Sequence, residues 1–180
     1  MAEKKLQTTI MLNGCTFERN GKFVTVKGTK GELKRKLSDN NIIIKNEGET
    51  LHLSFEKTGK KQKAQLFTTA AHIKNMIKGT LNGYNYKLKI CSGHFPMNVS
   101  LKGDKFEIKN FIGEKVPRTL KIKPGATVKI NGELIDVDGI DKEIVGQTAA
   151  SIEKLTRRPG FDKRIFQDGI YITEKDGKKI

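Results

Sequence analysis

The chain has 180 residues, of which 36% are hydrophobic and 31% charged, and its formal net charge is +15. This composition lies above that of disordered chains and suits one medium domain or two small ones. No segment approaches the roughly 20 apolar residues that cross a bilayer, which excludes a membrane-spanning helix. The two cysteines do not make a disulfide framework, so we expect a soluble, cytoplasmic protein.

The positive charge is present in both halves of the chain. Residues 1–82 carry 16 Lys and Arg against 7 Asp and Glu, and residues 83–180 carry 19 against 13. A single basic tail therefore does not explain it. Each Lys or Arg near a phosphate releases condensed counterions, which favours a nucleic acid as partner over an anionic membrane surface.

The first half predicts strands followed by one helix. FVTVKG and KGELKRKL alternate around a Lys-Gly turn, as in a hairpin, and NIIIKN and ETLHLSF follow as two more strands. The period then changes to that of a helix over residues 64–81, and Gly79 and Gly83 mark its end. The apolar residues at helical spacing are Leu66, Ala70, Ile73, Ile77 and Leu81.

The second half predicts the same order of elements. FPMNVSLKG, KFEIKNF, TLKIKP, ATVKING and ELIDVDG read as short strands. Asp141 is a suitable helix N-cap with Glu143 in the first turn. The apolar stripe of this helix consists of Val145, Ala149, Ile152 and Leu155.

Two sequence matches indicate a duplicated unit. Residues 24–34 align with residues 99–109, and residues 69–76 align with residues 148–155 in the same order. Chance similarity between short Lys-rich strands is the alternative. We predict an α+β protein of two tandem similar domains, residues 1–82 and 83–180, each a small, mainly antiparallel sheet packed against one helix.

The sequence offers no coherent set of catalytic or metal-binding residues. Cys91 and His94 form a C-x-x-H pair, but a structural zinc needs four ligands and no second pair exists. Cys15 lies near the repeat-equivalent position of Cys91, as two small core residues would. No P-loop or dinucleotide fingerprint occurs. We therefore expect neither an enzyme nor a cofactor or small-molecule substrate.

Basic residues gather after the second helix, in the segment RRPGFDKRIF. Four cations exceed what capping a helix dipole requires, so we predict phosphate contacts there. Phe161 could stack on a base, although a role as a packing anchor is favoured. The four cations are Arg157, Arg158, Lys163 and Arg164.

Two further clusters complete the predicted RNA-binding residues. SGHFPMN contains His94 and Asn98, short polar groups that can meet sugars and phosphates. Lys60, Lys61 and Lys63 stand at the start of the first helix, where cations are unfavourable unless an anion is bound. A mobile, solvated loop explains these lysines equally well.

These blocks also carry a family resemblance. HIKNMIKGTLNGYNYKLKI, SGHFPMNV, IKNFIGEK, GIDKEIVGQTAASIEK and FQDGIYITEK resemble successive blocks of the large-subunit ribosomal protein family numbered six in bacteria and archaea, and nine in eukaryotes. The resemblance extends from about Ala70 to Lys175 and is weaker before Gly28. HFPMNV and FQDGIYITEK resemble the archaeal and eukaryotic branch.

The resemblance implies a structural constituent of the large ribosomal subunit. It implies binding to large-subunit rRNA near the sarcin–ricin loop and the translation-factor docking region, mainly by the second domain, with ribosomal proteins as neighbours. Assembly in the nucleolus is expected if the source is eukaryotic. The alternatives are a free basic RNA-binding regulator and an RNA-acting enzyme. The bacterial ending of this region differs from RRPGFDKRIFQDG, so its contacts do not transfer residue by residue.

Overall fold

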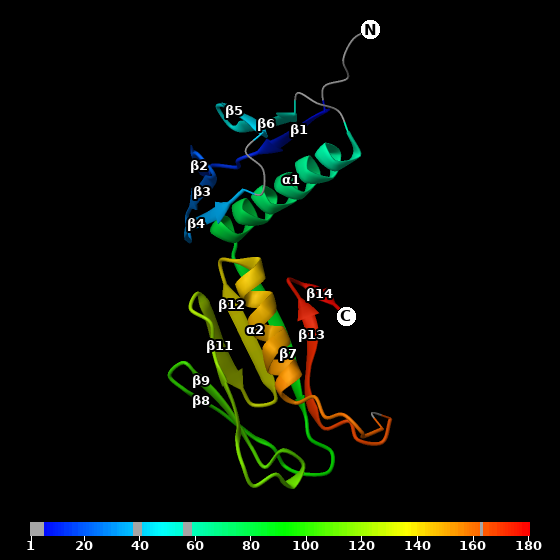
Figure 1. Ribbon diagram of the computed structural model, residues 1–180. Helices are drawn as coiled ribbons and strands as arrows, with labels where there is room; N and C mark the ends of the chain where they lie inside the picture. The colour runs from blue at the N-terminus through cyan, green and yellow to red at the C-terminus, as the bar shows by residue number, and fades with distance from the viewer. Residues whose placement is uncertain (1–5, 38–40, 56–58, 163) are drawn as a thin grey trace. The chain divides into compact units, whose positions relative to one another are not determined.

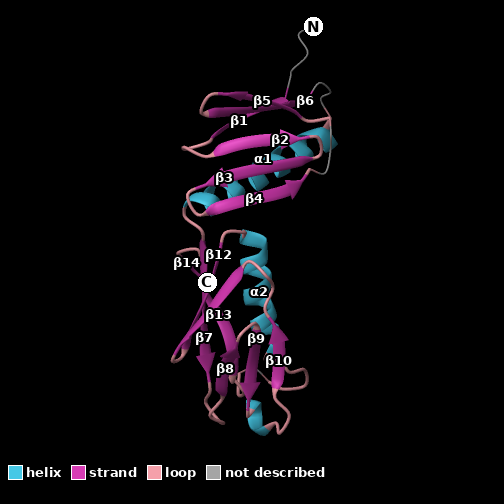
Figure 2. Cartoon of the chain, turned by 90° about the vertical axis from the view of Figure 1, so that its left-hand side faces the viewer, coloured by secondary structure: helices cyan, strands magenta, loops and turns pink. Residues whose placement is uncertain are grey.

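The structure, a computed structural model, describes residues 6–37, 41–55, 59–162 and 164–180. The chain divides into two compact units, residues 1–83 and residues 84–180, here called unit 1 and unit 2. Within the described residues each unit combines antiparallel strands with one α-helix (Figure 1, Figure 2). The predicted α+β class is confirmed.

Unit 1 contains two three-stranded antiparallel sheets, with strand orders β1-β6-β5 and β2-β3-β4. The sequence predicted a single sheet. The turn between β1 and β2 carries the chain from the first sheet to the second, so the strands pair in two separate sets. The elements are β1 (Leu6–Met11), β2 (Thr16–Asn20), β3 (Phe23–Gly28), β4 (Gly31–Lys36), β5 (Ile43–Glu47), β6 (Thr50–Phe55) and α1 (Lys60–Leu81).

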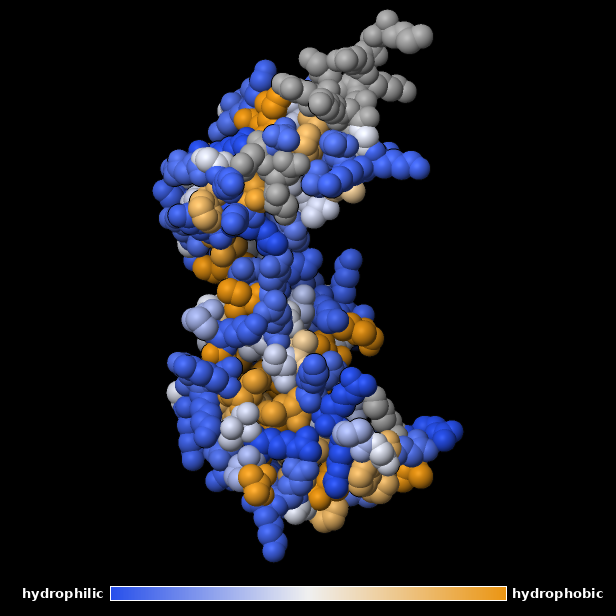
Figure 3. Space-filling model, in the orientation of Figure 1, coloured by the Kyte–Doolittle hydropathy of each residue, from blue (hydrophilic) through white to orange (hydrophobic). Residues whose placement is uncertain are grey.

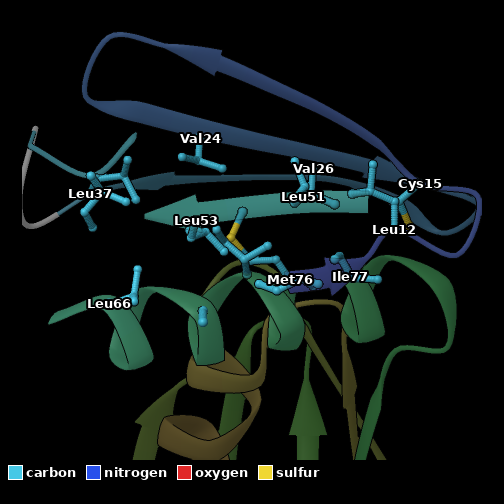
Figure 4. Packing of buried hydrophobic residues seen from close by; sticks show 14 of the residues in the cluster. Leu12, Cys15, Val24, Val26, Leu37, Leu51, Leu53, Leu66, Met76 and Ile77 are labelled. Atoms are coloured by element: carbon cyan, nitrogen blue, oxygen red, sulfur yellow. The ribbon is translucent and has the colours of Figure 1, made fainter. Parts of the chain in front are cut away.

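The core of unit 1 lies between the strands and the apolar stripe of α1 (Figure 4). Leu66 and Ile77 of the helix face Val26 and Leu53 of the strands, and all four side chains are at most 4% exposed. Burial of apolar surface of this kind stabilises the unit by roughly 25 cal/mol per Å². The helical period read from the sequence therefore corresponds to the buried face.

The ends of α1 differ in part from the prediction. Gly79 lies inside the helix, and only Gly83 adopts the left-handed conformation, with φ of +74°. The N–H of Gly83 donates to the carbonyl oxygen of Gly79 at 2.9 Å, which satisfies one terminal carbonyl. The helix begins at Lys60, earlier than residue 64, where the predicted helix began. The apolar period could not show this start, because the residues of the first turn are polar and mostly exposed.

Unit 2 has a three-stranded sheet, β8-β9-β10, and a five-stranded sheet, β11-β12-β7-β13-β14. The side chain of Asp141 accepts a hydrogen bond from the backbone N–H of Glu143 at 2.8 Å, so it caps α2 as predicted. The elements are β7 (Tyr84–Cys91), β8 (Asn98–Lys102), β9 (Lys105–Lys109), the 3-10 helix η1 (Phe111–Gly113), β10 (Arg118–Lys121), β11 (Ala126–Asn131), β12 (Leu134–Gly139), α2 (Lys142–Leu155), β13 (Gly169–Lys175) and β14 (Lys178–Lys179).

The two units repeat one topology. The order β1-β6-β5 corresponds to β7-β12-β11, and β2-β3-β4 corresponds to β8-β9-β10. Individual hydrogen bonds recur as well. Leu12 N–H donates to Glu49 O at 2.8 Å in unit 1, and Ile90 N–H donates to Glu133 O at 2.7 Å in unit 2. The duplication inferred from the sequence is therefore present in the backbone pairing.

The helix alignment of the repeat is correct at the level of side chains. The matched positions Thr69 and Thr148 are both buried, as are Ala70 and Ala149. Ile73 and Ile152 continue the pattern and are each 1% exposed or less. Each helix therefore presents the same stripe to its own sheets.

The hairpin alignment of the repeat was wrong by one strand. Residues 24–34 and 99–109 both form hairpins, but β3 is a central strand whose counterpart is the central strand β9, not β8. Burial supports the pairing of β3 with β9. Val24 and Val26 of β3 are buried, as is Phe106 of β9, whereas Val99 of β8 is only partly buried. The alignment relied on matching Lys-Gly pairs, which lie at the tight turns of the hairpins. Such residues are common in tight turns in general, so they do not show which strands correspond.

Unit 2 carries an extension after α2 that has no counterpart among the described residues of unit 1. After α2 the chain runs through residues 156–168 and returns as β13, which pairs antiparallel with the outer edge of β7. Figure 1 shows β13 in red beside the green β7. Residues 156–168, here called the return segment, contain the predicted cluster of cations.

Candidate nucleic-acid interface

Hydrophilic residues cover most of the face shown in Figure 3, in keeping with a net charge of +15. Unit 2 nevertheless exposes Phe95, Phe161 and Ile165, at 44%, 37% and 63%. All three lie in the 92–98 loop or in the return segment. Exposed apolar side chains therefore occur in the same two segments as the predicted polar and basic contacts.

Arg118 of β10 fixes the point at which the return segment leaves α2. Its guanidinium donates a hydrogen bond to the carbonyl oxygen of Leu155 at 2.6 Å. It also donates two hydrogen bonds to the carboxylate of Glu114, at 2.6 and 2.7 Å, and this pairing is the main cause that lowers the pKa of Glu114. Arg118 thereby satisfies a terminal helix carbonyl and orients the start of the return segment.

Arg157 and Arg158 are predicted cations whose side chains make no hydrogen bond or ion pair among the described residues, although Arg158 is half-buried and interacts electrostatically with Glu114. The Arg157 side chain is exposed and makes no hydrogen bond or ion pair among the residues that the structure describes. The Arg158 guanidinium lies 4.1 Å from the centre of the Phe161 ring. Stacking of this kind leaves the N–H donors of a guanidinium free for a phosphate.

Arg164 is engaged by a neighbour. Its guanidinium lies 2.8 Å from a carboxylate oxygen of Asp162, and this hydrogen bonding lowers the pKa of Asp162 and raises that of Arg164. A paired cation offers a phosphate less net charge, although the Arg164 side chain remains 90% exposed. The fourth predicted cation, Lys163, lies outside the described residues.

Asp168 joins the 92–98 loop to the end of the return segment. One carboxylate oxygen accepts hydrogen bonds from the backbone N–H of Gly93 (2.7 Å) and of His94 (2.9 Å), and the other lies 2.6 Å from His94 Nδ1. Burial raises the pKa of Asp168, but the hydrogen bonds from His94 and Gly93 outweigh it, so the pKa lies below its usual value. The buried carboxylate therefore stays charged and holds the loop.

Aromatic rings connect the same two segments. The His94 and Phe166 rings lie 5.1 Å apart, and the Phe166 and Phe161 rings meet edge-on at 5.0 Å. The Arg158 guanidinium also lies against the Phe161 ring. The structure thus brings His94 together with the return segment as one continuous surface.

Asn98 and the three lysines of α1 stand in other places. Asn98 is exposed at the first residue of β8, in the same unit as His94. Lys60, Lys61 and Lys63 are exposed in the first turn of α1, in unit 1. That turn holds no acidic residue, and its N-cap, a glycine, provides no side-chain hydrogen bond, so among the described residues no carboxylate of the turn offsets the three cations at the positive end of the helix dipole.

Sequence reasoning missed the residues that position this surface. Asp168 and Arg118 are separated from their partners by up to 75 residues, and the C-terminal strands that carry the extension were not predicted. Asn110 was missed too, although its side chain donates to the carbonyl oxygen of Pro96 at 3.0 Å. Single carboxylates and amides before strands look like ordinary turn residues, so no local signal marked them.

The two cysteines lie near each other in the repeat but do not occupy the same position. Because Leu12 corresponds to Ile90, Cys91 corresponds to Asn13, two residues before Cys15. Cys15 is buried beside Thr80, while Cys91 ends β7. Among the described residues, no three His, Cys, Asp or Glu side chains gather as metal ligands would.

A duplicated α+β fold that presents a basic and aromatic surface on its second unit is typical of a protein that assembles with RNA. The model of the family described as ribosomal protein L6 matches residues 13–83 and 95–169, one segment in each unit. The chain belongs to this family, which consists of ribosomal proteins and not of enzymes. Neither helix of the described residues is long and apolar enough to span a membrane.

Two relatives extend over nearly the whole chain. A protein of Methanococcus vannielii named large ribosomal subunit protein uL6 is 52% identical over 163 residues, covering 91% of this chain and 90% of the relative. A protein of the same name from Ignicoccus hospitalis is 46% identical over 169 residues, with the same shares covered. The family predicted from the sequence blocks is confirmed.

Proposed function

We propose that the chain is a structural constituent of the large ribosomal subunit and binds large-subunit rRNA mainly through unit 2. The rRNA site lies near the sarcin–ricin loop and the translation-factor docking region, beside neighbouring ribosomal proteins. The protein acts in the cytoplasm as part of the ribosome. It performs no chemistry, and it holds RNA by neutralising phosphates and matching shape.

One observation carries the choice of surface. Asp168 fixes the 92–98 loop against the return segment. In the described part of the chain the side chain of Arg157 makes no hydrogen bond or ion pair, and Arg158 lies against the Phe161 ring with only an electrostatic interaction with Glu114. A cation that is already positioned and makes no ion pair gives the most favourable phosphate contact. We expect Arg157 and Arg158 to contribute most, with His94 and Asn98 at the edge, and Arg164 and Lys163 less.

The lysines of α1 are the second contact in this proposal. Lys60, Lys61 and Lys63 place three positive charges at the positive end of a helix dipole, a costly arrangement in the free protein. A phosphate group relieves that repulsion, because it meets both the cations and the free N–H groups of the first turn.

Sedimentation of a cell lysate tests the function. A tagged copy of the chain should migrate with large subunits in a sucrose gradient and remain there after a wash in high salt. A free RNA-binding regulator or an RNA-acting enzyme would appear mainly in the soluble fraction after that wash. Exclusive recovery in the soluble fraction would overturn the proposed role.

A further inference from the structure

A cleft in unit 2 lies between α2, η1 and the return segment. Its volume is about 570 Å³, within the range of sites that hold small organic groups. The lining combines four aromatic rings with cations and two carboxylates. The residues that matter for a ligand are Phe161, Tyr171, Lys154, Arg157, Glu153 and Asp168.

The aromatic wall of the cleft is partly open. Phe161 and Tyr171 are each 37% exposed, so part of each ring remains uncovered by the protein. The Phe161 ring is held in place by Phe166, whose ring meets it edge-on at 5.0 Å, and by the Arg158 guanidinium, 4.1 Å from its centre. A braced, half-exposed ring is a suitable platform on which a planar base can stack.

The polar groups that line the cleft differ in how much hydrogen-bonding capacity remains for a ligand. Both carboxylate oxygens of Asp168 are occupied by the 92–98 loop. Within the described part of the chain the side chain of Glu153 accepts one hydrogen bond, from the N–H of Ile172 to Oε1 at 3.2 Å, and none to Oε2. Lys154 and Arg157 supply positive charge at the same cleft. The arrangement fits a ligand with an N–H donor edge and an attached phosphate.

The backbone beside the cleft is strained. Ile112 adopts φ of +47° and ψ of +42°, and Asn110 adopts φ of +58°. A β-branched residue in the left-handed region is energetically unfavourable, and such strain concentrates at functional sites. This strain places Ile112 in the lining opposite α2.

We propose that this cleft receives one unstacked base of the RNA, which stacks on Phe161 and donates its exocyclic amino group to Glu153. Arg157 and Lys154 bind the flanking phosphates. The inference rests on the proposed function and adds base recognition to it. Cytosine, adenine and guanine carry such an amino group, whereas uracil has a carbonyl oxygen at the position of the cytosine amino group and offers the carboxylate only its ring N3–H, so we expect uracil to bind more weakly.

Short single-stranded RNAs test this directly, because oligocytidylate and oligouridylate differ in the group that faces Glu153. The full chain should bind oligocytidylate roughly fivefold more tightly than oligouridylate, and Glu153→Gln should abolish the difference while keeping the bond to Ile172. Phe161→Ala should weaken both by roughly tenfold, and Phe161→Tyr should restore binding to within about twofold.

The matched control is Phe67→Ala, which removes a 49% exposed phenylalanine from unit 1 and should leave both affinities unchanged. Equal affinity of the wild type for the two RNAs, or an unaltered affinity of a folded Phe161→Ala variant, would overturn the base site. Sedimentation with the large subunit decides the proposed function separately. Co-sedimentation without base preference would reject the cleft alone.

Discussion

The carboxylate of Asp168 lies 2.6 Å from Nδ1 of His94 and also accepts the backbone N–H of the same residue. This single buried side chain connects two segments that are 74 residues apart in sequence. It sets the orientation of the His94 ring, so that Nδ1 is used internally and Nε2 remains the nitrogen for an external partner. The predicted RNA-binding surface of unit 2 depends on that connection.

Replacing Asp168 by Asn should loosen the 92–98 loop. The amide loses the charge-assisted bonds to His94 and Gly93, and we expect a loss of about 2 kcal/mol in the free energy of unfolding. Hydrogen exchange should show faster exchange at the amides of residues 93 and 94. The control Asn98→Ala alters an exposed neighbour and should leave both measurements unchanged. Protected amides in a folded Asp168→Asn variant would contradict the anchoring role.

The pKa of Asp168 predicts an acid limb of stability. Its pKa is lowered in the fold, so its stabilisation is complete above the unfolded value of roughly 4 and disappears as the pH falls through the folded value. Urea unfolding between about pH 6 and 2 should show a steeper fall for the wild type than for Asp168→Asn. Glu114 behaves in the same direction and should leave part of the slope in the variant. Parallel curves would exclude a contribution from Asp168.

Arg118 and Arg157 should separate stability from binding. Arg118→Gln removes the bonds to Glu114 and Leu155 and should lower the free energy of unfolding by about 2–3 kcal/mol. Arg157→Gln changes a side chain without an ion pair in the described residues, so it should weaken RNA binding and leave unfolding unchanged. Denaturant titration and RNA binding, measured on both variants, should give opposite patterns. A large loss of stability in Arg157→Gln would show that this side chain has a structural role.

The sequence predicted those features that depend on local periodicity. The helical stripes around Ile73 and Ile152 and the cap at Asp141 are local patterns, and the structure confirms each of them. The hairpin alignment failed for the same reason that made it attractive. The matched glycines reflect the requirements of tight turns, which hairpins share in general. The strand order shows which strands correspond: β3 corresponds to β9, because each is the central strand of its three-stranded sheet.

The arrangement of the candidate site was not accessible from local patterns. The sequence indicated the cations and the 92–98 loop as separate clusters. It carried no sign that Asp168 would join them, or that Arg164 would pair with Asp162 while Arg158 stacked on Phe161. These contacts arise from tertiary folding of the extension after α2, which has no counterpart in the described part of unit 1.

The α1 lysines should trade stability against RNA binding. Changing Lys60, Lys61 and Lys63 to Gln removes three cations from the positive end of a helix dipole, so thermal unfolding should show an increase in stability of roughly 1 kcal/mol. If all three contact phosphates, the slope of log K against log salt should become shallower by roughly 2. A more stable variant with an unchanged slope would remove unit 1 from the proposed interface.

The most direct measurement is the salt dependence of rRNA binding by the double variant Arg157→Gln, Arg158→Gln. Phosphate contacts release counterions, so two lost contacts should reduce the slope of log K against log salt by roughly 1.4 to 1.8. Folding of the variant is checked by circular dichroism, and binding is titrated against protein-free large-subunit rRNA at several salt concentrations. The proposed interface predicts that reduction, with weaker binding to cognate and unrelated structured RNA alike. A folded double variant with the wild-type slope would contradict it.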